Sequence, residues 1–234
     1  MHLTRTRGST LLKLCLVAVS LAMAAAAHAV PITGLFNTGV DNIGNALPAN
    51  QNDPHYDLTF PTVNTEVTVI DTAFPIPPWV ANNPFSRWIG PTSNGDAPSG
   101  NYTYRTTFSL PANANLNSAS ISGLWSTDDA SIDILINGNS TGNTTGGHAA
   151  LWPFLINGSG LFQAGLNTLD FQLNNSPLAG PTSPTGLRVD RIRGDYLVIP
   201  EPASTCLVVA ALVTALGTLR HQSRTAYPTP VRQH

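Results

Sequence analysis

Short runs in which apolar and polar residues alternate recur through the middle of this 234-residue chain. Successive side chains of a strand lie on opposite faces, so this alternation predicts half-buried β-strands. No stretch between the two ends of the chain sustains a helical period. Short strands separated by turn residues are typical of a β-sandwich or barrel, and the pattern therefore predicts an all-β domain. The predicted strands are residues 66–70, 102–110, 118–124, 131–136, 166–173 and 186–198.

The same alternation predicts which face of each strand is buried. In the run 166–173, the residues Leu169, Phe171 and Leu173 fall on one face. The run 131–136 ends at Asn137-Gly138, a pair typical of a tight hairpin turn. We expect two packed antiparallel sheets with eight residues in the core: Phe108, Leu110, Ile134, Ile136, Leu169, Phe171, Leu187 and Val189.

The first 29 residues have the pattern of a secretory signal peptide. Three basic residues, the last of them Lys13, precede the apolar run 14–27, which is too short for a comfortable membrane span. Ala27-His28-Ala29 then supplies the small-x-small pattern of a cleavage site. We expect signal peptidase and the export machinery to process residues 1–29, although the segment could also stay as an uncleaved anchor. Residues 30–64 are less regular and are either part of the β-domain at 65–198 or a lead-in to it.

A second apolar segment lies near the C-terminus. Residues 203–219 carry no charge, and their length is at the lower limit of a membrane-spanning helix. Arg220 follows at once, then Arg224, and basic flanks favour the cytoplasmic side. The pattern predicts one C-terminal transmembrane helix with the tail 220–234 in the cytoplasm.

The residues just before this segment are Pro200-Glu201-Pro202, a stiff, extended peptide because proline restricts its own backbone and that of its predecessor. The order of Pro200-Glu201-Pro202, an apolar helix and a basic end resembles the PEP-CTERM sorting signal of bacterial envelope proteins. The resemblance implies that an exosortase, a membrane-embedded transpeptidase, recognises the tail 199–234. It also implies a final location at the cell surface or in extracellular polymer, after transient anchoring in the inner membrane.

Charge and cysteine content narrow the possible partners. Only 10% of all residues are charged, and between residues 30 and 199 there are twelve acidic residues, five arginines and no lysine. Such a domain cannot neutralise a run of phosphates, which argues against nucleic-acid binding. The two cysteines, Cys15 and Cys206, lie in the two apolar end segments, so disulfides are not expected in the β-domain.

Four pieces of the middle region resemble the galactose-binding-like jelly roll. They are Tyr104-Arg105-x-x-Phe108-x-Leu110, the run from Asp128 to Gly138, Gly165-Leu166-Asn167-Thr168-Leu169 and Gly186-Leu187-Arg188-Val189. The resemblance implies a β-sandwich architecture. It implies function only loosely, because this fold carries sugar-binding modules, accessory domains of enzymes and adhesive proteins alike.

Candidate sites for metal ions and catalysis are few. Asp128, Asp129 and Asp133 could provide oxygen ligands to calcium, but they lack the spacing of a calcium loop and suit turns and strand ends equally. His55 and His148 are the only histidines between residues 30 and 199, which leaves a zinc site without a ligand set. No nucleophile elbow is present, and no cofactor is expected.

Aromatic residues offer the better indication of a ligand. Exposed tryptophan can stack on a sugar ring, and neutral polar side chains can hold its hydroxyl groups. Trp88 is expected in the core, and Trp152 is the candidate for exposure, with His148 and Asn143 from the glycine-flanked loop before it. The alternative is that the tryptophans only anchor long loops onto the core.

The sequence therefore predicts a non-catalytic, exported protein of the cell envelope or extracellular matrix. Its β-domain would interact with exopolysaccharide or with neighbouring surface proteins. The alternative is an enzyme that acts on polysaccharide, or the carbohydrate-binding module of such an enzyme. A close pair of carboxylates with shifted pKa values in a cleft would favour the enzyme.

Overall fold

The computed structural model describes residues 28–144, 146–158, 160–177 and 180–199, and within them all regular structure is β-strand. The predicted apolar helix at 203–219 and the residues of the signal peptide before His28 lie outside these ranges. Across the described ranges, no helix is long and apolar enough to span a membrane. The strands are β1 (Ala29–Pro31), β2 (Asn52–Phe60), β3 (Thr65–Ile70), β4 (Trp88–Gly90), β5 (Asp96–Ala97), β6 (Gly100–Leu110), β7 (Ala114–Asp128), β8 (Ala130–Ile136), β9 (Asn139–Ser140), β10 (Trp152–Asn157), β11 (Gly165–Asn175), β12 (Ser183–Pro184) and β13 (Gly186–Val198).

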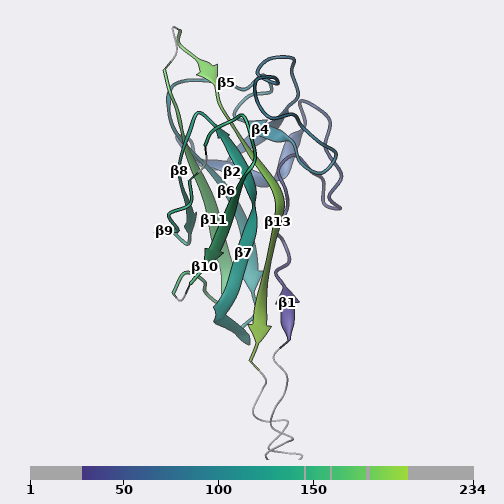
Figure 1. Cartoon of the computed structure of the whole chain (residues 1–234), viewed down its shortest axis with the longest axis vertical. Coiled ribbons are helices and arrows are strands. Elements are labelled where there is room, and N and C mark those ends of the chain that lie inside the picture. Colours follow the sequence, from purple (N-terminus) through teal and green to yellow (C-terminus); the bar gives the residue numbers. More distant parts are fainter. Residues whose placement is uncertain (1–27, 145, 159, 178–179, 200–234) are drawn as a thin grey trace, which may run out of the picture. The chain divides into compact units, whose positions relative to one another are not determined.

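The strands form one large, strongly curled antiparallel sheet (Figure 1). Its order is β10-β7-β13-β4-β3-β2-β6-β11-β8-β9, and β1 pairs with β13 beside this path. The two short strands β5 and β12 pair separately. The curl brings the two halves of the sheet face to face, an arrangement consistent with a β-sandwich.

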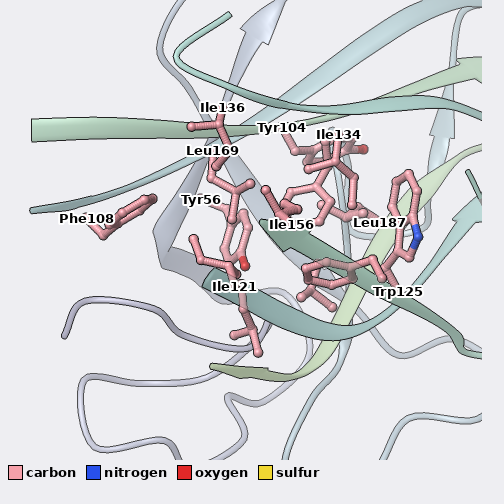
Figure 2. Close-up of a cluster of buried hydrophobic side chains, with 14 of the residues drawn as sticks. Tyr56, Tyr104, Phe108, Ile121, Trp125, Ile134, Ile136, Ile156, Leu169 and Leu187 are labelled. Carbon is pink, nitrogen blue, oxygen red and sulfur yellow. The ribbon is translucent and has the colours of Figure 1, made fainter. Parts of the chain in front are cut away.

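Aromatic contacts show how the two halves meet. Phe171 on β11 lies 5.6 Å from the ring of Trp125 on β7 and 5.9 Å from that of Phe154 on β10, centroid to centroid. Tyr56 of β2, in the same half of the sheet as β11, lies 6.3 Å away. Figure 2 shows the surrounding aliphatic side chains, which come from both halves and fill the space between them.

The predicted core is confirmed. All eight side chains expected to point inward are buried, and Phe171 is completely so. The hairpin at Asn137-Gly138 is also confirmed, because β8 ends at Ile136, β9 begins at Asn139, and both turn residues have positive φ angles, of 51° and 80°.

The six predicted strands are present, but β7 is much longer than expected. Seven further strands in the described part of the chain were not predicted, and the two longest of them are β2 and β10. β10 escaped because Pro153 and Leu155 interrupt its alternation with apolar residues, and as an edge strand it tolerates a proline. β2 lies in the segment 30–64 and pairs with both β3 and β6. At least that part of the irregular segment belongs to the sheet.

Candidate functional site

Trp152 is the exposed tryptophan of the domain. It stands at the start of edge strand β10 with 43% of its surface accessible, whereas Trp79, Trp88 and Trp125 are buried. The prediction that Trp88 is a core residue is confirmed. An exposed indole at the end of an edge strand is free on one side to stack on a ligand.

The glycine loop, which contains Gly146 and Gly147, precedes β10 in the chain and lies next to its first residue. Trp152 pairs with Trp125 of β7, and Gly147, five residues earlier in the chain, contacts Ser126, the next residue of β7. The Trp152 ring lies against Gly146, where any side chain would collide with it. Ser126 Oγ donates a hydrogen bond of 2.8 Å to the Gly147 carbonyl oxygen. The predicted loop and Trp152 therefore do lie side by side.

His148 stands further along the same edge. Its Nδ1 is 2.8 Å from Asp128 Oδ1, and its side chain is partly exposed. His148 contacts Asp128, and Trp152 pairs with Trp125, three residues earlier on β7. Since a strand rises about 3.3 Å per residue, His148 and Trp152 lie about 10 Å apart along the edge. The two side chains therefore stand at different positions along one edge of the sheet.

Asn143 has a structural set of partners. Its Nδ2 donates to Thr141 Oγ1 at 2.9 Å and to the Leu155 carbonyl oxygen at 3.3 Å, and its Oδ1 accepts the Leu155 N–H at 3.4 Å. The side-chain amide thus pairs with the free edge of β10 as a neighbouring strand would, and it covers one residue of that edge. Asn143 holds the loop in place beside Trp152.

Asp128 is the electrostatically unusual group at this edge. Burial, and then the neighbouring Asp129 carboxylate, raise its pKa to about 6. One carboxylate oxygen accepts a 3.0 Å hydrogen bond from Trp79 Nε1, and the other lies against His148. These contacts join the end of β7 to the 72–82 loop and to the glycine loop.

The three candidate calcium ligands have separate partners. Asp129 Oδ2 accepts the Ser176 N–H at 2.7 Å, and Asp133 accepts hydrogen bonds from the Ile134 N–H and the Ser140 hydroxyl. In the described part of the chain, no group of three or more His, Cys, Asp or Glu residues is arranged to hold a metal ion.

The structure also contains a polar pocket that the sequence did not indicate. Two loops, the one between β1 and β2 and the one between β3 and β4, border a pocket of about 510 Å³. The sequence signal was weak because these residues are far apart in the chain and read as ordinary turn residues. We call this the loop pocket; it is lined by Asn45, Ala46, Asp71, Asn82, Asn83, Pro84 and Arg87.

A mainly apolar groove of about 610 Å³ runs between β2 and the start of β6. Leu58, Phe60, Pro98 and Tyr102 are among its lining residues. Half of the Phe60 side chain is exposed there. Nothing in the described structure fills this groove.

The remaining predicted sites lie mostly outside the described residues. This applies to the sorting motif Pro200-Glu201-Pro202, to the basic flank at Arg220 and Arg224, and to Ala27. Ala29 is described and pairs with Leu197 at the start of β1. No protein-family model matches the chain, and no curated protein resembles it in sequence.

Proposed function

We propose that this chain is an exported protein of the bacterial cell envelope or extracellular matrix, whose β-sandwich binds polysaccharide without cleaving it. The observation that carries the proposal is the exposure of Trp152 beside the glycine loop, while the other three tryptophans are buried. An exposed indole adds little to core packing, but it can stack on a pyranose ring.

The finer fold assignment is a galactose-binding-like jelly roll. The curled antiparallel sheet, the hairpin at Asn137-Gly138 and the burial of Phe108, Leu110 and Leu187 support it. These three residues belong to the segments that resemble the jelly-roll family in sequence, and their burial agrees with the core positions expected there. The loops of such a fold can vary without disturbing the core.

The ligand is a neutral glycan. An acidic domain with five arginines repels polyanions, whereas stacking on Trp152 and hydrogen bonds from His148 require no charge on the ligand. His148 Nδ1 is engaged with Asp128, so Nε2 is the ring nitrogen that can meet a hydroxyl group. Asn143 holds the loop in place through its hydrogen bonds to Thr141 and Leu155.

Sorting completes the proposal. Signal peptidase removes residues 1–29, and an exosortase recognises Pro200-Glu201-Pro202 and separates the domain from the helix at 203–219. The protein then reaches the surface or matrix, where exopolysaccharide and neighbouring surface proteins are its partners.

An enzyme that acts on polysaccharide is the second candidate, and Asp128 is the observation that favours it. Its pKa of about 6 and its contact with His148 are features of acid–base groups. Release of new reducing ends from a polysaccharide, abolished by Asp128→Asn, would establish this activity.

A glycan array probed with the purified protein tests the binding proposal. We expect retention on neutral glycans and its loss in Trp152→Ala, with a thermal midpoint close to that of the wild type because the side chain is half exposed. If Trp152→Ala unfolds the domain instead, Trp152 is a structural residue and the proposed site is wrong.

A further inference from the structure

A buried arginine holds the backbone of one of the two loops that line the loop pocket. Arg188 on β13 is 1% exposed, and its guanidinium donates hydrogen bonds to the carbonyl oxygens of Val80 and Ala81 and, at 3.0 Å, to Ser86 Oγ. Its charge is balanced by Asp190, 3.8 Å away. Burying a charged side chain is costly, and here it fixes the backbone of the loop that lines the pocket.

Two asparagines of the pocket also belong to this scaffold. Asn82 accepts the Trp88 N–H at 2.8 Å and donates to the Ile70 carbonyl oxygen at 2.9 Å. Asn83 accepts the Phe85 and Ser86 N–H groups and donates to Asp190 at 3.0 Å. Their hydrogen-bonding groups are occupied, so they shape the pocket rather than bind a ligand.

Three other polar side chains of the pocket keep unused capacity. Arg87 NH1 donates to Asp71 Oδ2, its Nε is buried without a partner, and no hydrogen bond from its NH2 group is found among the described residues. Asp71 is exposed and has lone pairs left after its bonds with Arg87 and Asn82. Asn45 Nδ2 is 3.3 Å from Asp41 Oδ2, while its Oδ1 has no partner in the described part of the chain.

The same two loops also carry large apolar residues that point to solvent. They are Ile43 at 82% exposure, Phe74 at 65% and Phe85 at 67%. Ile43 lies in the turn closed by Asp41 and Asn45, and Phe85 lies in the turn closed by Asn83 and Ser86. A polar pocket whose loops carry exposed apolar side chains suits a ligand that has both hydroxyl groups and apolar C–H faces.

We propose that the loop pocket is a second binding site, distinct from the Trp152 edge, and that it takes a single neutral sugar unit with adjacent hydroxyl groups. Arg87 donates to one hydroxyl, Asp71 and Asn45 accept from its neighbours, and Phe85 covers a C–H face of the ring. The Arg87–Asp71 pair leaves the binding groups without net charge, so the pocket does not select an anion. The pocket, of about 510 Å³, has room for one sugar unit at a chain end, whereas the edge at Trp152 accepts a stretch of polymer.

Saturation-transfer difference NMR of the full-length protein with methyl glycosides of glucose, galactose and mannose tests this. We expect at least one of them to bind with a dissociation constant of about 1 mM, since one sugar ring buries little surface. Phe85→Ala and Asn45→Ala should each weaken binding about fivefold or more. Both side chains are exposed, so neither variant should change the thermal midpoint appreciably.

Two controls separate this site from its alternatives. Phe60→Ala removes another exposed phenylalanine, from the groove between β2 and β6, and should leave binding unchanged. Trp152→Ala should also leave it unchanged, and loss of binding there would assign the sugar to the Trp152 edge and overturn the inference. Absence of binding by all three glycosides, or stronger binding of glucuronate than of the neutral glycosides, would overturn it as well.

Discussion

The packing of the two halves of the sheet can be tested at Phe171. This side chain is completely buried on β11, and its ring meets Trp125 and Phe154 from the opposite half and Tyr56 from its own. Truncation to alanine removes a ring with aromatic neighbours on several sides, and such neighbours cannot all move in to fill the space. We expect Phe171→Ala to cost about 3–5 kcal/mol of unfolding free energy, in the upper half of that range.

The matched control lies five residues earlier on the same strand. Leu166 is 61% exposed, so Leu166→Ala should change the unfolding free energy by less than about 0.5 kcal/mol. Urea or guanidinium denaturation of a fragment spanning residues 28–199 measures both values, and an unchanged m-value shows that the comparison is valid. A loss below about 1 kcal/mol for Phe171→Ala would refute the assigned face and register of β11.

Three further outcomes follow from the charged groups and the tail. Burial raises the pKa of Asp53 to about 6, so the folded state binds a proton more tightly than the unfolded state, and this contribution to stability is lost as pH rises from about 4 to above 6. Asp53→Asn should remove the share of this dependence that Asp53 contributes, up to about 3 kcal/mol in denaturant melts, while Asp128, whose pKa is also raised to about 6, keeps its own share. A wild type that gains stability from pH 5 to pH 7.5 would contradict the prediction. Arg188→Met should lower the free energy of unfolding by about 3–5 kcal/mol, because it leaves Asp190 buried without its cation. Arg191→Met, at an exposed position, should be nearly neutral, and equal losses of unfolding free energy in the two variants would refute the scaffold role of Arg188. For sorting, we expect intact-mass measurement of the surface form to show loss of residues 206–234; their retention in all mature protein would leave a simple membrane anchor.

The sequence was most informative where one physical rule acts alone. Alternation predicted the buried faces of β6, β8, β11 and β13, because a strand packed on one side leaves little choice of which residues are apolar. It failed at β10, where Pro153 and Leu155 on the solvent side are themselves apolar. The turn at Asn137-Gly138 was predictable because few residue pairs accept positive φ at both positions.

The candidate sites were predictable only in part. The place of Trp152 between His148 and Pro153, after the glycine-flanked loop, indicated its exposure. The engagement of Asn143 with Leu155 depends on the course of the loop, and the convergence of Asn45 with Asp71 and Arg87 depends on two loops meeting in space. Neither of these two arrangements has a local sequence signal. Asn and Asp are common in turns because of the backbone conformations that they favour, so their presence there does not indicate a site.

Co-sedimentation with a neutral exopolysaccharide, at low salt and at about 0.5 M salt, tests the central proposal most directly. Wild-type protein and Leu155→Ala, which alters an exposed residue of the same strand β10, should sediment with the polymer equally at both salt concentrations, without shortening it. Trp152→Ala should stay in solution while keeping its thermal midpoint. Binding that persists in Trp152→Ala, or that disappears at high salt in the wild type, would contradict a neutral-glycan surface at Trp152.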